Sequence, residues 1–272
     1  MIKPRKRDTN TPARLILAFA FVSIAAPTQA AGTLDKIAQS GTITLGYRNA
    51  APPFSYVDDK NQPIGYSIDI CAKIVDAVRR ELKRPDITVK YVPVSTANRI
   101  PALLSGEIDL ECATTTNTAE RRKQVAFTIP TFIAAMRVMA KETGGISSIH
   151  DLAGKTVVTT QGTTGERLLS EYNKNHSLQA TLIPGKSDNE SFALLEAGKA
   201  VAFLTDDVIL YSQRATSKTP EAYAIARDPL TIEPLAIMLR KDDPGFKKMV
   251  DTEVSRIITR GEIPDHYPHL FL

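Results

Sequence analysis

This chain of 272 residues lacks several patterns that commonly carry chemistry. Its four histidines, at positions 150, 176, 266 and 269, show no paired spacing and do not lie near a cysteine or acid cluster at metal-ligand distance. No serine occupies a nucleophile-elbow motif. Low-complexity segments and internal repeats are also missing. These absences argue against a metal centre or a hydrolase triad, and no cofactor is expected.

Long apolar runs are missing beyond residue 30, so a soluble mature chain is expected. The first thirty residues have a basic start, a short apolar stretch at 15–26 and small residues at 28–30. That stretch is too short to span a bilayer as a stable helix. We therefore expect 1–30 to be a cleavable signal peptide and the mature protein to be periplasmic. An uncleaved N-terminal anchor is the alternative.

A strong excess of charge is missing as well, once this segment is set aside. Residues 1–30 contain five basic residues and one acid, a net of +4 that equals the +4 of the whole chain. The remainder therefore has no net charge, and the composition gives no support for a nucleic-acid partner. About 240 residues are left, enough for one large domain or two lobes.

Cysteine is scarce, because Cys71 and Cys112 are the only two in the chain. In an oxidising compartment they could form a disulfide. Such a bridge would close a loop of about 40 residues and stabilise the fold by roughly 3–4 kcal/mol in the chain-entropy model. Two buried free thiols are the alternative, since cysteine also packs as a small apolar residue.

The regular elements expected along the chain alternate between strand and helix, which predicts an α/β fold with mainly parallel sheets. Two successive sets of about a hundred residues each suggest two lobes. Strands are expected at 42–46, 87–92, 108–113, 134–140, 156–160, 180–183, 200–204, 222–226 and 234–240. Helices are expected at 34–38, 68–82, 97–105, 166–173, 191–197, 208–215 and 244–258.

The stretch 98–128 is the most informative part of the chain. It combines an amphipathic helix, a glycine turn, a buried strand, a threonine-rich loop and a basic segment. Its polar side chains Arg99, Thr114, Thr116 and Arg121 suit a carboxylate held by hydroxyls and a guanidinium. No acid/base pair or thiol dyad accompanies them, so the stretch favours binding a small charged molecule over transforming one.

Other candidates also lie where expected strands end, the place where ligands bind in such sheets. The segment 162–164 opens a helix and could bind an anion, although it could also be a plain helix cap. Of Asp206 and Asp207, one could cap a helix and the other could meet a cation. Arg48 follows a strand, with an ordinary surface residue as its alternative.

Seven motifs occur in order along the chain: PPFSY (52–56), GYSID (65–69), NRIP (98–101), ECATTTNTAERR (111–122), GTT (162–164), AVAFLTDD (200–207) and LRKDDPGFK (239–247). In these motifs the chain resembles the extracytoplasmic solute-binding proteins of polar amino-acid ABC transporters, and most of all the glutamate/aspartate-binding subgroup. The resemblance covers 34–262, most of the mature chain.

The resemblance implies two α/β lobes joined by a two-stranded hinge, with lobe 1 formed by 31–136 and 234–272 and lobe 2 by 137–233. It also implies a monomer that binds an amino acid and delivers it to ABC permease subunits. By position, Arg121, Thr116 and Thr164 would hold the α-carboxylate, and Thr114 and Asp206 the α-ammonium. Arg48, Thr96 and Arg99 would face the ligand side chain.

One residue departs from the family pattern. Members often carry a histidine near the ligand side chain where this chain has Asp188. This acid could pair with Arg48 or Arg99, could favour the amides glutamine or asparagine as ligands, or could point to solvent. A further alternative is a periplasmic dehydratase of cyclohexadienyl amino-acid precursors on the same fold, with Asp188 or Asp206 as general acid.

Overall fold

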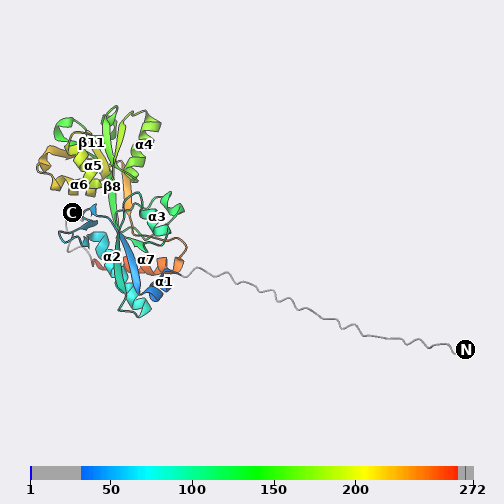
Figure 1. Cartoon of the computed structure of the whole chain (residues 1–272). Coiled ribbons are helices and arrows are strands. Elements are labelled where there is room, and N and C mark those ends of the chain that lie inside the picture. Colours follow the sequence, from blue (N-terminus) through cyan, green and yellow to red (C-terminus); the bar gives the residue numbers. More distant parts are fainter. Residues whose placement is uncertain (2–31, 263–266, 268–272) are drawn as a thin grey trace. The chain divides into compact units, whose positions relative to one another are not determined.

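The computed structural model describes residue 1, residues 32–262 and Tyr267 (Figure 1). The predicted signal peptide lies outside the described residues apart from residue 1. The described residues from Gly32 onward belong to one compact unit. Among them, no helix is long and apolar enough to cross a membrane.

The helices match those expected from the sequence, with shifts at their ends. They are α1 (Thr33–Ser40), α2 (Tyr66–Leu82), α3 (Arg99–Leu104), α4 (Thr164–His176), α5 (Asp188–Glu196), α6 (Asp207–Thr216) and α7 (Pro244–Arg260). The start of α5 matters most, because it lies at Asp188 and not at Ser191 as expected. Ser187 caps this helix by accepting a hydrogen bond from the backbone N–H of Glu190, which explains the earlier start.

The first lobe is built on a five-stranded sheet with the order β5-β1-β6-β14-β7. Its strands are β1 (Thr42–Tyr47), β5 (Thr88–Pro93), β6 (Leu110–Glu111), β7 (Ala126–Phe127) and β14 (Met238–Leu239). A small antiparallel sheet, formed by β2 (Ala50–Ala51), β3 (Ser55–Val57) and β4 (Pro63–Ile64), precedes α2. Helices α1, α2, α3 and α7 belong to this lobe.

The second lobe is built on a six-stranded sheet with the order β10-β9-β11-β8-β12, in which β13 also pairs with β8. Its strands are β8 (Phe132–Lys141), β9 (Thr156–Thr160), β10 (Thr181–Gly185), β11 (Ala202–Asp206), β12 (Tyr223–Ile225) and β13 (Thr231–Leu235). Helices α4, α5 and α6 pack on this sheet. Figure 1 shows them in one part of the molecule and α1, α2, α3 and α7 in the other, with β8 running between the two.

The two-lobed α/β fold with mainly parallel sheets is as predicted, although each sheet contains one strand that runs against the others. That strand is β14 in the first sheet and β8 in the second. The reason is the double crossing between lobes. The chain enters the second sheet along β8 and returns along β13, which pairs antiparallel with β8 from Thr231 opposite Met136 to Leu235 opposite Phe132.

The expected strand at 234–240 is divided by this return. Its first part belongs to β13 in the second sheet, and its last part is β14 in the first. The apolar run 235–239 stays buried throughout, which is why its sequence reads as one strand.

The core of the first lobe shows why α2 forms where it does. Ile70, Ile74 and Val78 recur at helical spacing and are fully buried against the sheet. Cys71 lies on the same buried face and forms a disulfide with Cys112, which follows β6. Of the two alternatives for the cysteines, the structure has the disulfide, with a Cα–Cα distance of 6.2 Å that suits the bond.

Candidate functional site

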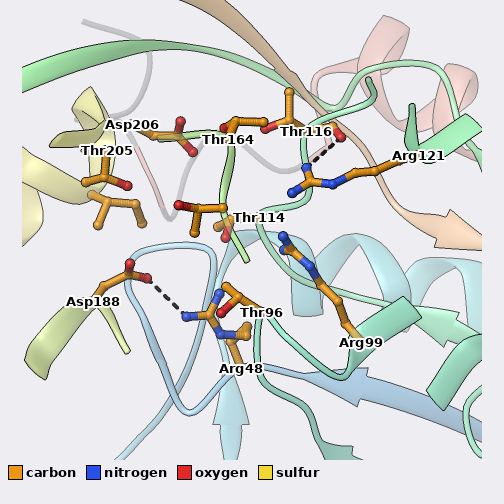
Figure 2. Close-up of a pocket in the computed structure, with 12 residues that line it drawn as sticks. Arg48, Thr96, Arg99, Thr114, Thr116, Arg121, Thr164, Asp188, Thr205 and Asp206 are labelled. Carbon is orange, nitrogen blue, oxygen red and sulfur yellow. Dashed lines mark hydrogen bonds and ion pairs between the residues drawn. The ribbon is translucent and has the colours of Figure 1, made fainter. Parts of the chain in front are cut away.

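A cavity lies between the two lobes, and polar side chains from both line it (Figure 2). The first lobe contributes Arg48, Thr96, Arg99, Thr114, Thr116 and Arg121, and the second contributes Thr163, Thr164, Asp188, Thr205, Asp206 and Ile209. The structure therefore brings together all nine residues that we predicted from the sequence to bind the ligand.

Two lining residues were missed in the sequence, while Thr163 belongs to the segment 162–164 that was considered as an anion site. Thr205 directly precedes the predicted site residue Asp206, so its neighbour in the chain was a usable signal. Ile209 lies in the first turn of α6 and is buried, and its apolar side chain carries no comparable signal.

The topology explains why these residues meet. Arg48 directly follows β1, Thr114 and Thr116 follow β6, and Asp206 ends β11. Parallel strands expose their carboxyl ends at one edge of a sheet, where ligands bind in open α/β folds. The two lobes turn these edges toward each other, which makes one cavity from two sets of loops.

An ion pair between the lobes joins Arg48 to Asp188. Arg48 Nη2 lies 3.1 Å from Asp188 Oδ2, and each side chain is only 5% exposed. The other carboxylate oxygen of Asp188 accepts a hydrogen bond of 2.6 Å from the Thr160 hydroxyl. Of the partners considered for Asp188, the structure has Arg48. The alternative in which Asp188 points to solvent is wrong, because the side chain is buried.

A buried carboxylate, that of Glu111, lies beside Arg99 and was not among the predicted site residues. Arg99 Nη1 donates to the Thr115 hydroxyl at 2.6 Å, and Thr115 in turn donates to Glu111 Oε1 at 2.8 Å. Glu111 Oε1 also lies 3.8 Å from Arg99 Nη1, and all three side chains are buried. Glu111 and Thr115 occur in the motif at 111–122, but nothing in that motif says which of its polar residues face the cavity.

Burial shifts the pKa values of Arg99 and Glu111. It lowers the pKa of Arg99 to about 9, with a further lowering by the neighbouring charge of Arg121. Burial also raises the pKa of Glu111, which the charge of Arg99 opposes. Arg99 Nε and Glu111 Oε2 have no hydrogen-bond partner among the described residues. A cation this strongly desolvated favours a further anion nearby.

Arg121 lies in a short 3-10 helix, Arg121–Lys123, and reaches across the cavity. Its Nη1 donates to the carbonyl of Thr116 at 3.0 Å and its Nη2 to the carbonyl of Gly162 at 3.2 Å, in the other lobe. Burial lowers the pKa of Arg121. Both of these partners are neutral carbonyls, so the guanidinium has no direct carboxylate contact of its own in the described residues.

Gly162 permits the close approach of the lobes at this point. Its φ of +74° is in the left-handed region, and an added Cβ would lie 3.0 Å from the carbonyl oxygen of Thr96. Thr96 itself donates from its hydroxyl to the carbonyl of Gln161 at 2.5 Å. A glycine is therefore required at 162 for both conformation and space.

The start of α4 supplies hydroxyl groups to the cavity. Thr163 caps the helix by accepting from the N–H of Glu166 and donates its own proton to the carbonyl of Thr160 at 2.6 Å. Thr164, the first residue of the helix, lines the cavity. The helix-cap interpretation of 162–164 is therefore confirmed for Thr163, whereas anion binding by this segment stays a prediction.

Asp206 and Asp207 divide their roles in a similar way. Asp207 accepts hydrogen bonds from the N–H groups of Ala135 and Val208 and lies 3.3 Å from Arg137 Nε. Asp206 makes no capping bond, and its buried Oδ1 has no partner in the described part of the chain. Burial raises the pKa of Asp206 well above its ordinary value, and the nearby charge of Glu233 adds to the rise.

The arrangement suits a small molecule with anionic groups and one cationic group. Three guanidiniums can meet carboxylates, Asp206 can meet an ammonium, and threonine hydroxyls can complete the hydrogen bonds. Residues 32–262 and Tyr267 contain no group of three or more His, Cys, Asp or Glu side chains that could hold a metal ion.

Comparison with known families agrees with this geometry. A family model described as bacterial extracellular solute-binding proteins, family 3, matches residues 43–271. The chain belongs to this family. The match covers both lobes and every residue that lines the cavity.

Two members of this solute-binding family illustrate the similarity. The chain is 42% identical to the glutamate/aspartate import solute-binding protein of Escherichia coli, over 92% of this chain and 85% of that protein. It is also 42% identical to the L-glutamate/L-aspartate-binding protein of Pseudomonas aeruginosa, over 96% of this chain and 87% of that protein.

Solved structures share the two-lobed fold of the family. One is the ancestral amino acid-binding protein AncCDT-1, a precursor of cyclohexadienyl dehydratase. It is 28% identical to this chain, with a TM-score of 0.75 over 89% of this chain and 100% of that one.

Proposed function

We propose that this solute-binding protein captures an acidic amino acid, glutamate or aspartate, and delivers it to the permease subunits of an ABC transporter. The observation that carries the proposal is the cavity itself, where three guanidiniums converge with an Asp206 oxygen that has no partner among the described residues. An acidic amino acid offers two carboxylates and one ammonium to such a set. The relatives at 42% identity carry the names of glutamate/aspartate binders.

The proposed ligand roles are those that the family resemblance implies by position, and the chemistry of each side chain supports them. Arg121, with Thr116 and Thr164, would hold the α-carboxylate, because its planar fork can give two parallel charge-assisted bonds. Thr114 and Asp206 would hold the α-ammonium. Arg48, Thr96 and Arg99 would face the ligand side chain. Asp188, which is paired with Arg48, would partly offset the positive charge of this arginine.

Ligand capture would involve closure of one lobe on the other. The proposed lobes are 31–136 with 234–272, and 137–233, so the hinge falls on the paired strands β8 and β13. Ligand contacts from both lobes would exist together only in the closed state, which would shift the equilibrium toward closure. The protein would act as a monomer.

The proposed location is the periplasm, after export by the signal peptide at 1–30 and its cleavage after residue 30. The proposed activity is binding without turnover. A dehydratase on the same fold would need a free general acid in the cavity. Asp188 is paired with Arg48, so Asp206, whose pKa is raised by burial, would have to be that acid. Incubation with a cyclohexadienyl amino-acid precursor tests this point, since dehydration of it would identify an enzyme.

The main test is calorimetry on residues 31–272 with glutamate, aspartate, glutamine and asparagine. We expect saturable binding of the acidic amino acids at one site per chain. Lack of binding to all four would refute the proposed function.

A further inference from the structure

The end of the cavity that would face the ligand side chain already contains its own counter-charges. Asp188 lies 3.1 Å from Arg48, and both side chains are buried. Thr160 holds the second oxygen of Asp188 at 2.6 Å and is itself hydrogen-bonded to Ser191 at 2.9 Å. The carboxylate is therefore fixed in place by its own lobe and directed at a guanidinium of the other.

The second guanidinium at this end is balanced in the same way. Arg99 reaches Glu111 through the Thr115 hydroxyl and lies 3.8 Å from it directly. Each of the two guanidiniums thus has a carboxyl group of the protein beside it before any ligand arrives.

This balance changes what a ligand side chain meets. A carboxylate that enters this buried end of the cavity places a second negative charge next to Asp188, which is costly at low dielectric. An amide adds no charge. Its oxygen can accept from a guanidinium, and its NH₂ group can donate to the carboxylate of Asp188.

We propose that Asp188 is a specificity-determining residue that fits this cavity to an amide side chain as well as to a carboxylate. The inference rests on the proposed function, because it concerns the ligand of the same site. It extends the ligand class from acidic amino acids to glutamine or asparagine, and it assigns the extension to one ion pair.

The test is the variant Asp188→Asn, with the affinities of glutamine and glutamate compared by calorimetry at pH 7. The substitution removes the charge and keeps an amide oxygen that can accept from Arg48, while its NH₂ group takes the place of the oxygen that accepted from Thr160 and can donate to that hydroxyl. Arg48 is then left buried without a counter-charge unless the ligand brings one. We expect wild-type affinities within about a hundredfold of each other, and we expect D188N to shift their ratio toward glutamate by about tenfold or more.

A matched control is Glu190→Gln in the same helix. Glu190 also lies in the first turn of α5, but it is exposed and its carboxylate accepts from the backbone N–H of Lys186. The variant removes the same charge from the same helix without touching Arg48, so the ratio is expected to stay at the wild-type value. Asp188→Thr provides a second charge-removing variant if D188N does not fold.

The outcomes separate this inference from the function on which it rests. Absence of binding to all four amino acids in the wild type refutes the proposed function. If glutamate binds, the inference on Asp188 is overturned by an unchanged ratio in D188N. It is also overturned by a wild type that binds glutamine more than a hundredfold more weakly than glutamate.

Discussion

The two ends of the cavity differ in how their charges are compensated. At the end near α6, Asp206 has a buried oxygen without a partner in the described chain, and there the Arg121 guanidinium donates to carbonyl groups and to no carboxylate. At the opposite end, Arg48 and Arg99 each have a carboxylate of the protein beside them. One end depends on the ligand for its counter-charges, and the other has its own.

This difference separates affinity from specificity. Groups without counter-charges gain most when a ligand supplies them, because a buried unpaired charge or acceptor is costly. Groups that are already paired gain little from one further charge. The α6 end should therefore provide most of the binding free energy for any amino acid, and the Arg48 end should decide which side chain is accepted.

The largest effect is expected for Arg121→Ala. Loss of this guanidinium leaves the ligand α-carboxylate without its cation, which should weaken binding by about 3–5 kcal/mol, roughly two to four orders of magnitude. Calorimetry with glutamate measures the change. Arg122→Ala is the control, since Arg122 is exposed and bonded to Asn117 outside the cavity. Equal losses in both variants would remove the assigned role of Arg121.

A smaller loss is expected for Asp206→Asn, about 2–3 kcal/mol, because an ammonium then meets an amide in place of a carboxylate. Calorimetry with glutamate again measures the change. Exposed Asp228 in the second lobe provides the control, as Asp228→Asn. An affinity in D206N equal to that of the control variant would contradict a role in holding the ammonium.

The pH dependence of binding gives an independent measure of Asp206. Its pKa in the ligand-free protein is raised well above 3.8, so the neutral form persists to higher pH than usual. Below that raised pKa, an ammonium can bind well only if Asp206 first loses its proton. Affinity should therefore rise with pH by up to about tenfold per unit until the raised pKa is passed. Binding titrations from about pH 4 to 8 should show this slope in the wild type, and a flat profile would contradict it.

The smallest effect on ligand affinity is expected at the end of the cavity that contains Arg48 and Arg99. Thr115→Val breaks the link between Arg99 and Glu111 and leaves both buried groups less satisfied. We expect the free energy of unfolding to fall by about 1–2 kcal/mol, with a smaller change in affinity than in the two preceding variants. Urea unfolding measures the first quantity. Thr115→Ser retains the hydroxyl and should restore most of the stability, whereas failure to restore it would point to lost packing of the methyl group.

Much of the fold could be predicted from local patterns. Apolar residues at helical spacing identified α2, and the alternation of strands with helices indicated an α/β chain. Local patterns did not reveal that the sheets are mixed. Strand direction depends on where the chain crosses between the lobes, and the run that contains β13 and β14 reads as one strand although it serves two sheets.

The site was predictable as a set of residues and less so as a set of contacts. All nine nominated side chains line the cavity, because residues at strand ends meet wherever parallel strands lie side by side. Glu111 was not predicted as part of the site. It lies within β6, where a buried carboxylate has no local signal, and only the neighbouring Arg99 accounts for it.

The sequence by itself determined the class of fold, the positions of the polar residues at strand ends and the excess of guanidiniums over free acids in the site. These properties follow from short-range patterns and from residue chemistry. The tertiary structure alone decided which charges neutralise one another. Arg48 and Asp188 are 140 positions apart and belong to different lobes, so their ion pair exists only where the lobes meet.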